Sequence, residues 1–311
     1  MESGYSVVNA LPPGYAPDYT SFLFHHPDHL KLQANDWVNF YLLRKLNQKA
    51  MAQVSFHIEG NQALSPVRAP FGSFLFSERL SPLGLYQFIQ HCEDELRKRG
   101  VKSIKIVDPP LFYRKTGQLL HTILFNLNYQ VSLAELSSGI LIDHLNFEEK
   151  IEMWEKRKLK QSKDKGLQCK LLPLSELETV YHFILKCRNQ KGYTLSMTLD
   201  ELKYTIEPFR SNFFLFGTFL KLEIAAASIA IRVHPSILYN FYSGHLKKFD
   251  SVSPAVLLTQ GMYKFCAQQN IQQLDLGTSA IDGQPNFSLL DFKLRLGALP
   301  SSKLTFEKLL A

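Results

Sequence analysis

The sequence predicts a mixed α/β protein that is built from two copies of one structural unit. Three observations support this fold class. Helical periodicities alternate with short runs typical of strands, the same order of helix, strand and helix occurs twice, and hydrophobic residues make up 45% of the 311 residues. That share is ample for the cores of two domains of ordinary size. We therefore expect central mixed sheets flanked by helices in both halves.

The second copy, residues 253–297, shows the order of elements most clearly. It begins with Ser253-Pro254, a hydroxyl that can cap a helix followed by a ring that suits the first helical turn. Apolar residues at helical spacing follow, and 271–277 has the pattern of a short strand that ends at a glycine. A loop rich in Gly, Pro, Asp and Asn then leads to a predicted helix over 288–296.

The first copy repeats this order. Ser81-Pro82 begins a predicted helix, 101–107 is a predicted strand, and apolar residues at helical spacing follow over 119–127. The two copies keep the same spacing when Asp108 is placed opposite Asp275. A repeat of this kind indicates a duplicated structural unit.

One difference between the copies concerns charge. In the alignment of the two copies, Asn126 stands opposite Lys293, so only the second copy carries a cation at that place. Because an unshared charge at an otherwise matched position points to a role beyond folding, we single out Lys293 as the strongest functional candidate. An exposed lysine on a helix is the alternative.

The remaining segments complete the two halves. A hairpin turn is expected at Asn47-Gln48, and the histidines of 25–29 are interpreted as a loop that enters a helix, because no carboxylate or thiolate motif completes a metal site. Two further helices are predicted over 173–190 and 199–209. Strands are predicted over 38–46, 50–58, 71–76, 129–136, 139–142, 167–172, 213–219, 225–233 and 237–242.

The most charged segment, 148–166, is predicted to be one amphipathic helix that links the halves. One side of it would carry Ile151, Trp154, Arg157, Lys158 and Gln161. Its cations can contact the phosphates of a ligand, and a solvated linker helix is the alternative. We therefore predict an N-terminal domain over 1–147 and a C-terminal domain over 167–311 that carries the active cleft.

The net charge of +7 favours an anionic partner such as a phosphorylated cofactor, a nucleic acid or a membrane surface, although it can also serve solubility alone. The four cysteines form no CxxC pair, and we expect them to be reduced. Lys221 and Glu223 interrupt the most apolar segment, so two strands are expected there and no membrane span. A cytoplasmic protein without a metal ion is expected.

Several segments in this order resemble a known fold. They are YNFYSGH (239–245), SPAVLL (253–258), LDLGTS (274–279) and DFKLRLGA (291–298), with KRKLKQSKDKG (156–166) at the domain junction. Their order resembles the GNAT acyltransferase fold, and the duplication resembles the FemAB-type acyltransferases that join two such units. The resemblance covers most of the chain and implies transfer of an acyl group to an amine.

The resemblance also implies where the donor binds. The thioester of an acyl-CoA would lie beside a splayed pair of strands, here 237–242 and 273–277, and its pyrophosphate would face 245–253. HLKKFDSVS at that place lacks the glycines that let backbone amides approach a phosphate. The predicted cofactor-binding residues are Lys247, Lys248, Ser253 and Arg157.

The predicted catalytic residues are Lys293 and Tyr242. In the FemAB-type pattern the lysine of the FK segment approaches the ligand's phosphate or the reacting carbonyl, where an ammonium stabilises negative charge. The Tyr242 phenol can donate to a thiolate or carbonyl, or simply pack. Acceptor recognition is predicted for Tyr239, Asp282, Gln284 and Asn286, and turn formation is the alternative for the last three.

Three functions remain open from the sequence. The first is transfer from acyl-CoA, such as acetyl-CoA, to a primary amine of a small metabolite or cell-envelope precursor. The second is aminoacyl transfer from charged tRNA. The third is a binding or scaffold protein that has kept the fold without the chemistry, because a fold alone does not establish an activity.

Overall fold

The structure, a computed structural model, describes residues 4–281 and 283–310, and these form two compact units. Unit 1 comprises the chain up to Leu136 together with the residues from Ser301 on, and unit 2 comprises Ser137–Pro300. Two halves were predicted, but with a boundary at residue 147 and a linker after it. The units of the structure change eleven residues earlier, within the strand β8 (Gln130–Leu141), whose first part belongs to unit 1 and whose last part belongs to unit 2.

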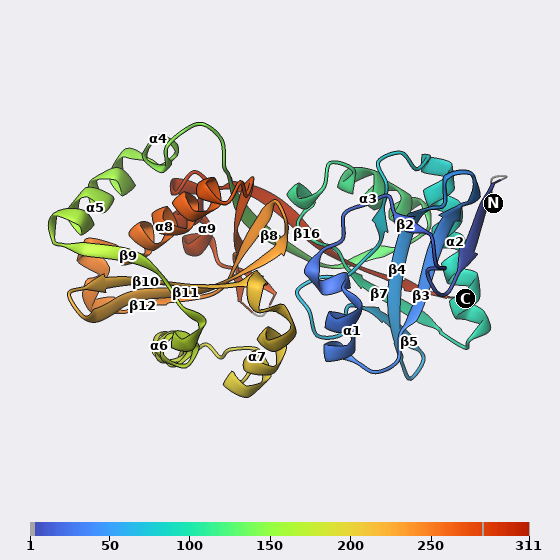
Figure 1. Ribbon diagram of the computed structural model, residues 1–311, viewed down its shortest axis with the longest axis horizontal. Helices are drawn as coiled ribbons and strands as arrows, with labels where there is room; N and C mark the ends of the chain where they lie inside the picture. The colour runs from blue at the N-terminus through green and yellow to red at the C-terminus, as the bar shows by residue number, and fades with distance from the viewer. Residues whose placement is uncertain (1–3, 282, 311) are drawn as a thin grey trace. The chain divides into compact units, whose positions relative to one another are not determined.

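Unit 1 is a mixed sheet with helices packed against it (Figure 1). The strand order is β1-β3-β4-β5-β7-β16-β8. Its strands are β1 (Tyr5–Val8), β2 (Ala16–Pro17), β3 (Val38–Arg44), β4 (Lys49–Glu59), β5 (Gln62–Ser65), β6 (Leu75–Phe76), β7 (Ser103–Val107), the first part of β8 (Gln130–Leu141) and most of β16 (Leu299–Leu309). Its α-helices are α1 (Pro27–Gln33), α2 (Pro82–Lys98) and α3 (Gly117–Asn126).

The start of α2 follows directly from its sequence. The Ser81 side chain accepts a hydrogen bond from the Gly84 N–H, and Pro82 occupies the first helical position, as predicted. The apolar face of α2 then packs with α3 and the central strands in one core, which includes Phe88 and Ile106. Burial of this face, rather than helix propensity, provides most of the stability of such a helix.

Unit 2 contains the remaining part of the same hydrogen-bonded sheet, in the strand order β8-β13-β12-β11-β10-β9, and a small separate hairpin. Beside β8, its strands are β9 (Leu167–Leu172), β10 (Phe213–Leu220), β11 (Glu223–His234), β12 (Ile237–His245), β13 (Gln273–Thr278), β14 (Ala280–Ile281) and β15 (Gln284–Pro285). Its helices are α4 (Phe147–Lys150), α5 (Met153–Asp164), α6 (Leu177–Asn189), α7 (Leu199–Ile206), α8 (Pro254–Gln268), α9 (Phe287–Arg295) and the 3-10 helix η6 (Lys247–Val252). Figure 1 shows α5 and α8 over one face of this sheet and α6 over the other.

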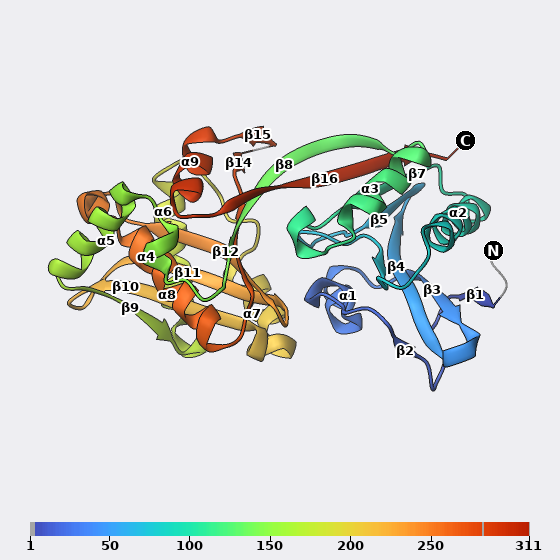
Figure 2. The ribbon, with the colours of Figure 1, turned by 90° about the horizontal axis from the view of Figure 1, so that it is seen from above.

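Two strands connect the halves of the sequence in an unexpected way. The predicted strands 129–136 and 139–142 form one strand, β8, whose end pairs with β13 in unit 2. The last strand, β16, returns to unit 1 and pairs with β7 there. Figure 2 shows β8 and β16 running beside each other, as their adjacent places in the strand order require. The final strand of each half thus completes the sheet of the other half.

The prediction of one linking helix over 148–166 is wrong. The chain forms α4 and α5 with an extended break at Ile151 and Glu152, and α5 packs against α8 inside unit 2. The buried side of α5 carries Glu155, Leu159 and Ser162, whereas Trp154, which was predicted to share one side with Ile151, is exposed. The buried side of α5 could not be recognised from apolar residues alone, because it includes a carboxylate and a hydroxyl.

The apolar segment 213–233 forms β10 and β11, so the predicted hairpin is confirmed. The two strands pair in antiparallel register from Phe213 opposite Ile231 to Leu220 opposite Glu223. Within the described part of the chain, no helix is long and apolar enough to cross a membrane.

Candidate functional site

The central strands of unit 2 separate at their carboxyl ends. β12 pairs with β13 in parallel from Ile237 opposite Gln273 to Tyr239 opposite Asp275, and the recorded pairing stops there. Beyond this point Phe241 is an extra residue in β12, because the register with β11 shifts between Tyr242 and Asn240. Such a bulge bends the strand and increases its twist, so the two carboxyl ends diverge.

Lys293 belongs to α9, and its ammonium lies at the carboxyl end of β13. Its ammonium donates hydrogen bonds to the carbonyl oxygens of Gly277 at 2.7 Å and Thr278 at 2.8 Å, and the residue is only 5% exposed. An ammonium has three N–H donors, and within residues 4–281 and 283–310 no third acceptor contacts this one. The cation is therefore fixed by the backbone with one donor left over.

Burial changes the protonation of this lysine. Desolvation lowers the pKa of Lys293 from 10.5 to about 8, the charge of Asp275 opposes this shift, and the charge of Arg188 adds to it. At neutral pH most of the population still carries the positive charge. The site therefore keeps an ammonium in a poorly solvated place, where it acts strongly on any nearby negative charge.

Asp275 and Gly277 shape the strand end that holds the lysine. The Asp275 carboxylate accepts hydrogen bonds from the Ser137 hydroxyl at 2.9 Å and the Gly277 N–H at 2.7 Å. Gly277 has φ of +76°, a conformation that favours glycine, and the Tyr239 ring would lie 3.4 Å from a Cβ at this position. Tyr239 is thus brought to the same strand end as Lys293.

Tyr242 has a different partner. Its hydroxyl lies 2.5 Å from the hydroxyl of Ser196, and its ring stacks on Phe241. Burial raises the pKa of the Tyr242 phenol, although the hydrogen bond with Ser196 partly opposes this. The phenol is therefore neutral at neutral pH and can donate a proton but cannot act as a base. In the described part of the chain no direct contact joins Tyr242 to Lys293.

The predicted phosphate turn is compact. Residues 247–252 form η6, with Phe249 and Val252 buried and the N–H of Phe249 bonded to the Leu246 carbonyl. Ser253 does not cap α8 as predicted: its backbone is left-handed, and its hydroxyl donates back to the Asp250 carbonyl. In the segment that would face a pyrophosphate, the Phe249 N–H and the Ser253 hydroxyl therefore already donate hydrogen bonds to carbonyls of the same segment.

The other predicted cofactor residues lie on the outside of unit 2. Lys248 forms an ion pair with Glu223, while Lys247 and Arg157 are exposed and form no ion pair with any described residue. Helix α5 contacts η6 through Ser162, whose hydroxyl donates to the Val252 carbonyl. The predicted basic residues are therefore on neighbouring elements, at the surface rather than beside Lys293.

The predicted acceptor residues lie mainly in turns. Asn286 caps α9 by accepting a hydrogen bond from the Leu289 N–H, which is the structural alternative stated for it. Gln284 is exposed and pairs with Ile281 in the β14–β15 hairpin. Asp282 lies outside the described residues. The loop that was predicted here is thus a small hairpin.

Arg188 was missed in the sequence. It is half-buried at the end of α6, where the helix dipole favours a cation, and it forms no ion pair with any described residue. Gly244 allows α6 to approach β12, because a Cβ there would meet the Cβ of Cys187 at 2.8 Å. Only this packing brings Arg188 close enough to influence Lys293, so no sequence signal could have revealed it.

A small pocket of about 190 Å³ lies elsewhere in unit 2, between α6, α7 and the segment that follows α7. Ion pairs between Lys203 and Glu178 and between Arg210 and Glu207 occupy part of its lining. None of the predicted site residues lines it. Among the described residues, no group of three or more His, Cys, Asp or Glu side chains is placed to hold a metal ion.

No protein-family model matches the sequence, and no curated protein sequence matches it either. Solved structures do match its fold. FemX has 11% sequence identity and a TM-score of 0.71, covering 93% of this chain and 92% of FemX. L-PGS from Bacillus licheniformis has 11% identity and a TM-score of 0.55, with 83% and 81% covered. A tandem GNAT protein from the clavulanic acid biosynthesis pathway has 10% identity and a TM-score of 0.51, with 89% and 83% covered. The predicted tandem GNAT-like fold is confirmed.

Proposed function

We propose that unit 2 transfers an acyl group to a primary amine, and that Lys293 stabilises the negative charge that develops in the transition state. The observation that carries this proposal is the buried ammonium at the divergent ends of β12 and β13, held by the Gly277 and Thr278 carbonyls with one donor left over. A fixed cation in a poorly solvated site needs little reorganisation when charge develops beside it. The fold shared with FemX and the tandem GNAT protein supports the same class of reaction.

In the proposed reaction the amine nitrogen attacks the carbonyl carbon of the activated acyl group. Negative charge develops on the carbonyl oxygen, and the free N–H of Lys293 donates to it. The bond to the leaving oxygen or sulfur then breaks and the amide forms. Tyr242, a neutral phenol, is the candidate proton donor to the leaving group, and the proton lost by the amine passes through water to the Tyr242 phenolate that results.

For the donor, we propose an aminoacyl ester of tRNA rather than acyl-CoA. The supporting observation is η6, whose buried Phe249 and Val252 and internally bonded amides occupy the place where acyl-CoA users of this fold bind the pyrophosphate. An ester on a ribose hydroxyl does not need this cradle. Acyl-CoA remains the second candidate, because the divergence of β12 from β13 is the feature that admits a thioester in the GNAT fold.

For the acceptor, the proposal is an amine that also carries a carboxylate or phosphate. Arg188 supports this choice, because it is half-buried, has no anionic partner among the described residues and acts electrostatically on Lys293. The positive charges of Arg188 and Lys293 repel each other, and an anion that binds beside Arg188 relieves this repulsion. Amino acids and phosphorylated amino sugars have the required groups.

The donor is tested by offering two labelled substrates with a panel of such amines. One is total tRNA charged with radiolabelled amino acids, and the other is radiolabelled acetyl-CoA. We expect acid-stable amide product from the charged tRNA alone. Product from acetyl-CoA would reverse the choice of donor, and tight binding of a ligand without turnover of either donor would favour the scaffold function instead.

The role of Lys293 is tested by the substitution Lys293→Met, with Asn126→Ala in unit 1 as the matched control. Loss of a single donor to a developing oxyanion slows related reactions by roughly 100-fold to 1,000-fold. We expect kcat to fall by this order in Lys293→Met while the control keeps its activity. An active Lys293→Met protein would remove the lysine from the mechanism.

A further inference from the structure

The outer face of α5 carries an unusual concentration of positive charge. The helix and the residue after it contain six cations and two carboxylates, and one carboxylate, Glu155, is buried against Arg295. Lys158 and Lys163 have ion-pair partners. The cations without an ion-pair partner among the described residues are Lys156, Arg157, Lys160 and Lys165. The proposed transfer reaction uses none of them.

Apolar side chains accompany this charge. Met153 and Trp154, in the first turn of α5, are 63% and 58% exposed. The Lys158 ammonium lies 5.7 Å from the centre of the Trp154 ring, so the indole is flanked by a cation. An exposed tryptophan beside basic residues is a costly arrangement in water, because its large apolar surface stays hydrated.

A second exposed apolar side chain, that of Leu222, lies near the other end of α5. The strand after α5 pairs with β10, with Leu167 opposite Leu220, so Lys165 and Lys221 lie at the same end of the sheet. Leu222, in the turn between β10 and β11, is 96% exposed. A fully exposed leucine is therefore flanked by lysines from two elements.

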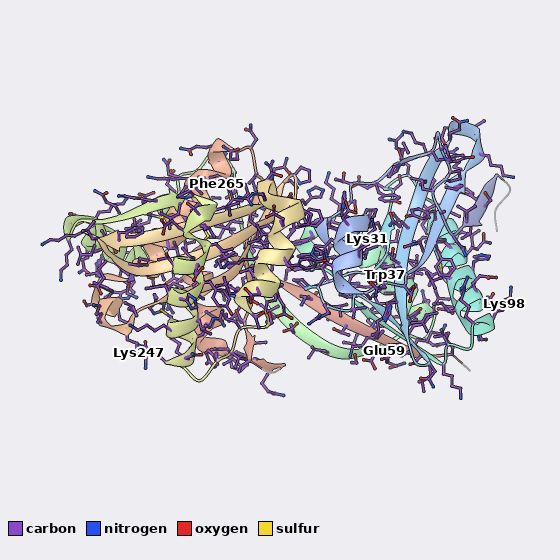
Figure 3. All side chains as sticks on the ribbon, turned by 60° about the horizontal axis from the view of Figure 1, so that its bottom comes forward. Lys31, Trp37, Glu59, Lys98, Lys247 and Phe265 are labelled. Atoms are coloured by element: carbon purple, nitrogen blue, oxygen red, sulfur yellow. The ribbon has the colours of Figure 1, made fainter. Side chains whose placement is uncertain are left out.

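Helix η6 extends the same surface. The ion pair between Lys248 and Glu223 ties η6 to the residue that follows Leu222, and the Leu246 N–H donates to the Ala225 carbonyl. Lys247 is exposed without an ion-pair partner in the described part of the chain, and Figure 3 shows its side chain extending away from unit 2. We call Trp154, Arg157, Lys160, Lys165, Lys221 and Leu222, together with Lys247, the α5 surface.

We propose that the α5 surface docks unit 2 on an anionic phospholipid bilayer. Clustered lysines and arginines are attracted to anionic headgroups by about 1 kcal/mol each, and tryptophan prefers the boundary between headgroups and acyl chains. Leu222 supports a bilayer over a nucleic acid, because an aliphatic side chain on a turn gains by entering acyl chains but offers no ring on which a base can stack. This proposal does not depend on the acyl-transfer reaction.

The first experiment uses Trp154 as a reporter of insertion. The chain has two tryptophans, so Trp37→Phe leaves Trp154 as the single tryptophan, whose emission is excited selectively at wavelengths that tyrosine does not absorb. This protein is titrated with vesicles of phosphatidylglycerol and phosphatidylcholine, and with vesicles of phosphatidylcholine alone. We expect a blue shift of the emission and cosedimentation with the anionic vesicles only, both reduced by salt. An unshifted emission with anionic vesicles would overturn the proposal.

Matched substitutions test which residues carry the binding. Leu222→Asp should weaken vesicle binding by at least about tenfold, because it removes the apolar contact and adds repulsion. Lys165→Gln and Lys221→Gln should each weaken it by roughly fivefold. The control is Leu46→Asp, at an 86% exposed leucine that also follows a lysine in a turn, but in unit 1.

The results of these binding experiments distinguish whether the α5 surface binds a bilayer, binds a nucleic acid or has no special role. Equal loss of binding in Leu46→Asp and Leu222→Asp would mean that any exposed leucine contributes, and the α5 surface would have no special role. Binding to a homopolymeric RNA with no binding to anionic vesicles would assign the surface to nucleic acid instead. Binding to the anionic vesicles that Leu222→Asp and Lys221→Gln both reduce, with Leu46→Asp unaffected, is the expected result.

Discussion

The two units place an aspartate at matched sequence positions but surround it differently. In unit 1, Asp108 is fully buried, forms an ion pair with Arg114 and accepts a hydrogen bond from His121 at 3.0 Å. In unit 2, Asp275 accepts hydrogen bonds from the Ser137 hydroxyl and the Gly277 N–H, and the nearby cation, Lys293, is held by backbone carbonyls. At the position of Lys293, unit 1 has the exposed Asn126.

This difference shows how one duplicated fold separates packing from chemistry. In unit 1 the Asp108 carboxylate at the end of β7 is paired with the Arg114 guanidinium and His121, so this cluster stabilises the unit by internal pairing. In unit 2 no ion pair joins the Lys293 ammonium or the Arg188 guanidinium to a described carboxylate, although the charge of Asp275 acts on Lys293. In the proposed function, the second copy keeps these less compensated charges for its reaction, and it does so at a cost in stability.

The strongest test of the comparison removes the last strand. A chain that ends at Pro300 lacks nearly all of β16, which pairs with β7 and carries the Lys308 ammonium that contacts the buried Glu93. We expect unit 1 to lose its folded structure while unit 2, which lies within 137–300, keeps its own. Hydrogen exchange measured by mass spectrometry reports each unit separately. Protected amides in α2 and β7 of the shortened chain would show that unit 1 does not need β16.

The next largest effect is expected from the two aspartates. Asp108→Ala leaves the Arg114 guanidinium, only 12% exposed, without its carboxylate and should cost about 3–5 kcal/mol of stability. Asp275→Ala removes the acceptor of the Ser137 hydroxyl and the Gly277 N–H, two neutral donors, and should cost about 1–3 kcal/mol. Urea denaturation of both variants measures the difference. Equal losses would mean that Asp108 is not the more stabilising of the two.

Much of this arrangement could be predicted from the sequence, and the exceptions have physical causes. The helix starts at Pro82 and Pro254, the hairpin of β10 and β11, and the duplication follow from local patterns, and the structure confirms them. The return of β16 to unit 1 could not be predicted, because strand pairing between distant segments leaves no local signal. The buried side of α5 was not recognised because Glu155 occupies a buried position that usually carries an apolar residue.

The candidate site was predictable only in part. Lys293 stood out because the other copy lacks it, and the structure places it in a buried site with backbone partners. Ser196 and Arg188 depend on how the end of α6 and the loop after it fold onto β12, which composition and spacing do not encode. The surface lysines were identified as a group, but only the fold shows that they lie on neighbouring outer elements.

A smaller effect concerns the pH dependence of unit 2. Because burial lowers the pKa of Lys293 to about 8, we expect kcat to decrease as pH rises above 8, when the ammonium is lost. In the unfolded chain Lys293 keeps its proton up to its ordinary pKa of 10.5, whereas in the native protein it loses the proton above about 8. As the pH rises from 8 to 10.5, the free energy of unfolding should therefore increase relative to that of Lys293→Met. Rate profiles and denaturation midpoints at several pH values check both signs. A rate that stays constant up to pH 10 would contradict the requirement for the cation.

The smallest effect is expected from Arg188, and it separates this residue from an ordinary helix-end arginine. Since the charge of Arg188 lowers the pKa of Lys293, Arg188→Gln should raise that pKa and move the decrease in kcat to higher pH. It should also weaken binding of an anionic acceptor by about tenfold, the usual loss for a hydrogen bond to a charged group. The control is Arg210→Gln, an exposed arginine of the same unit that pairs with Glu207. If both substitutions left the pH profile of the native protein unchanged, Arg188 would have only the role of favouring the end of α6, and the difference between the units would reduce to Lys293 alone.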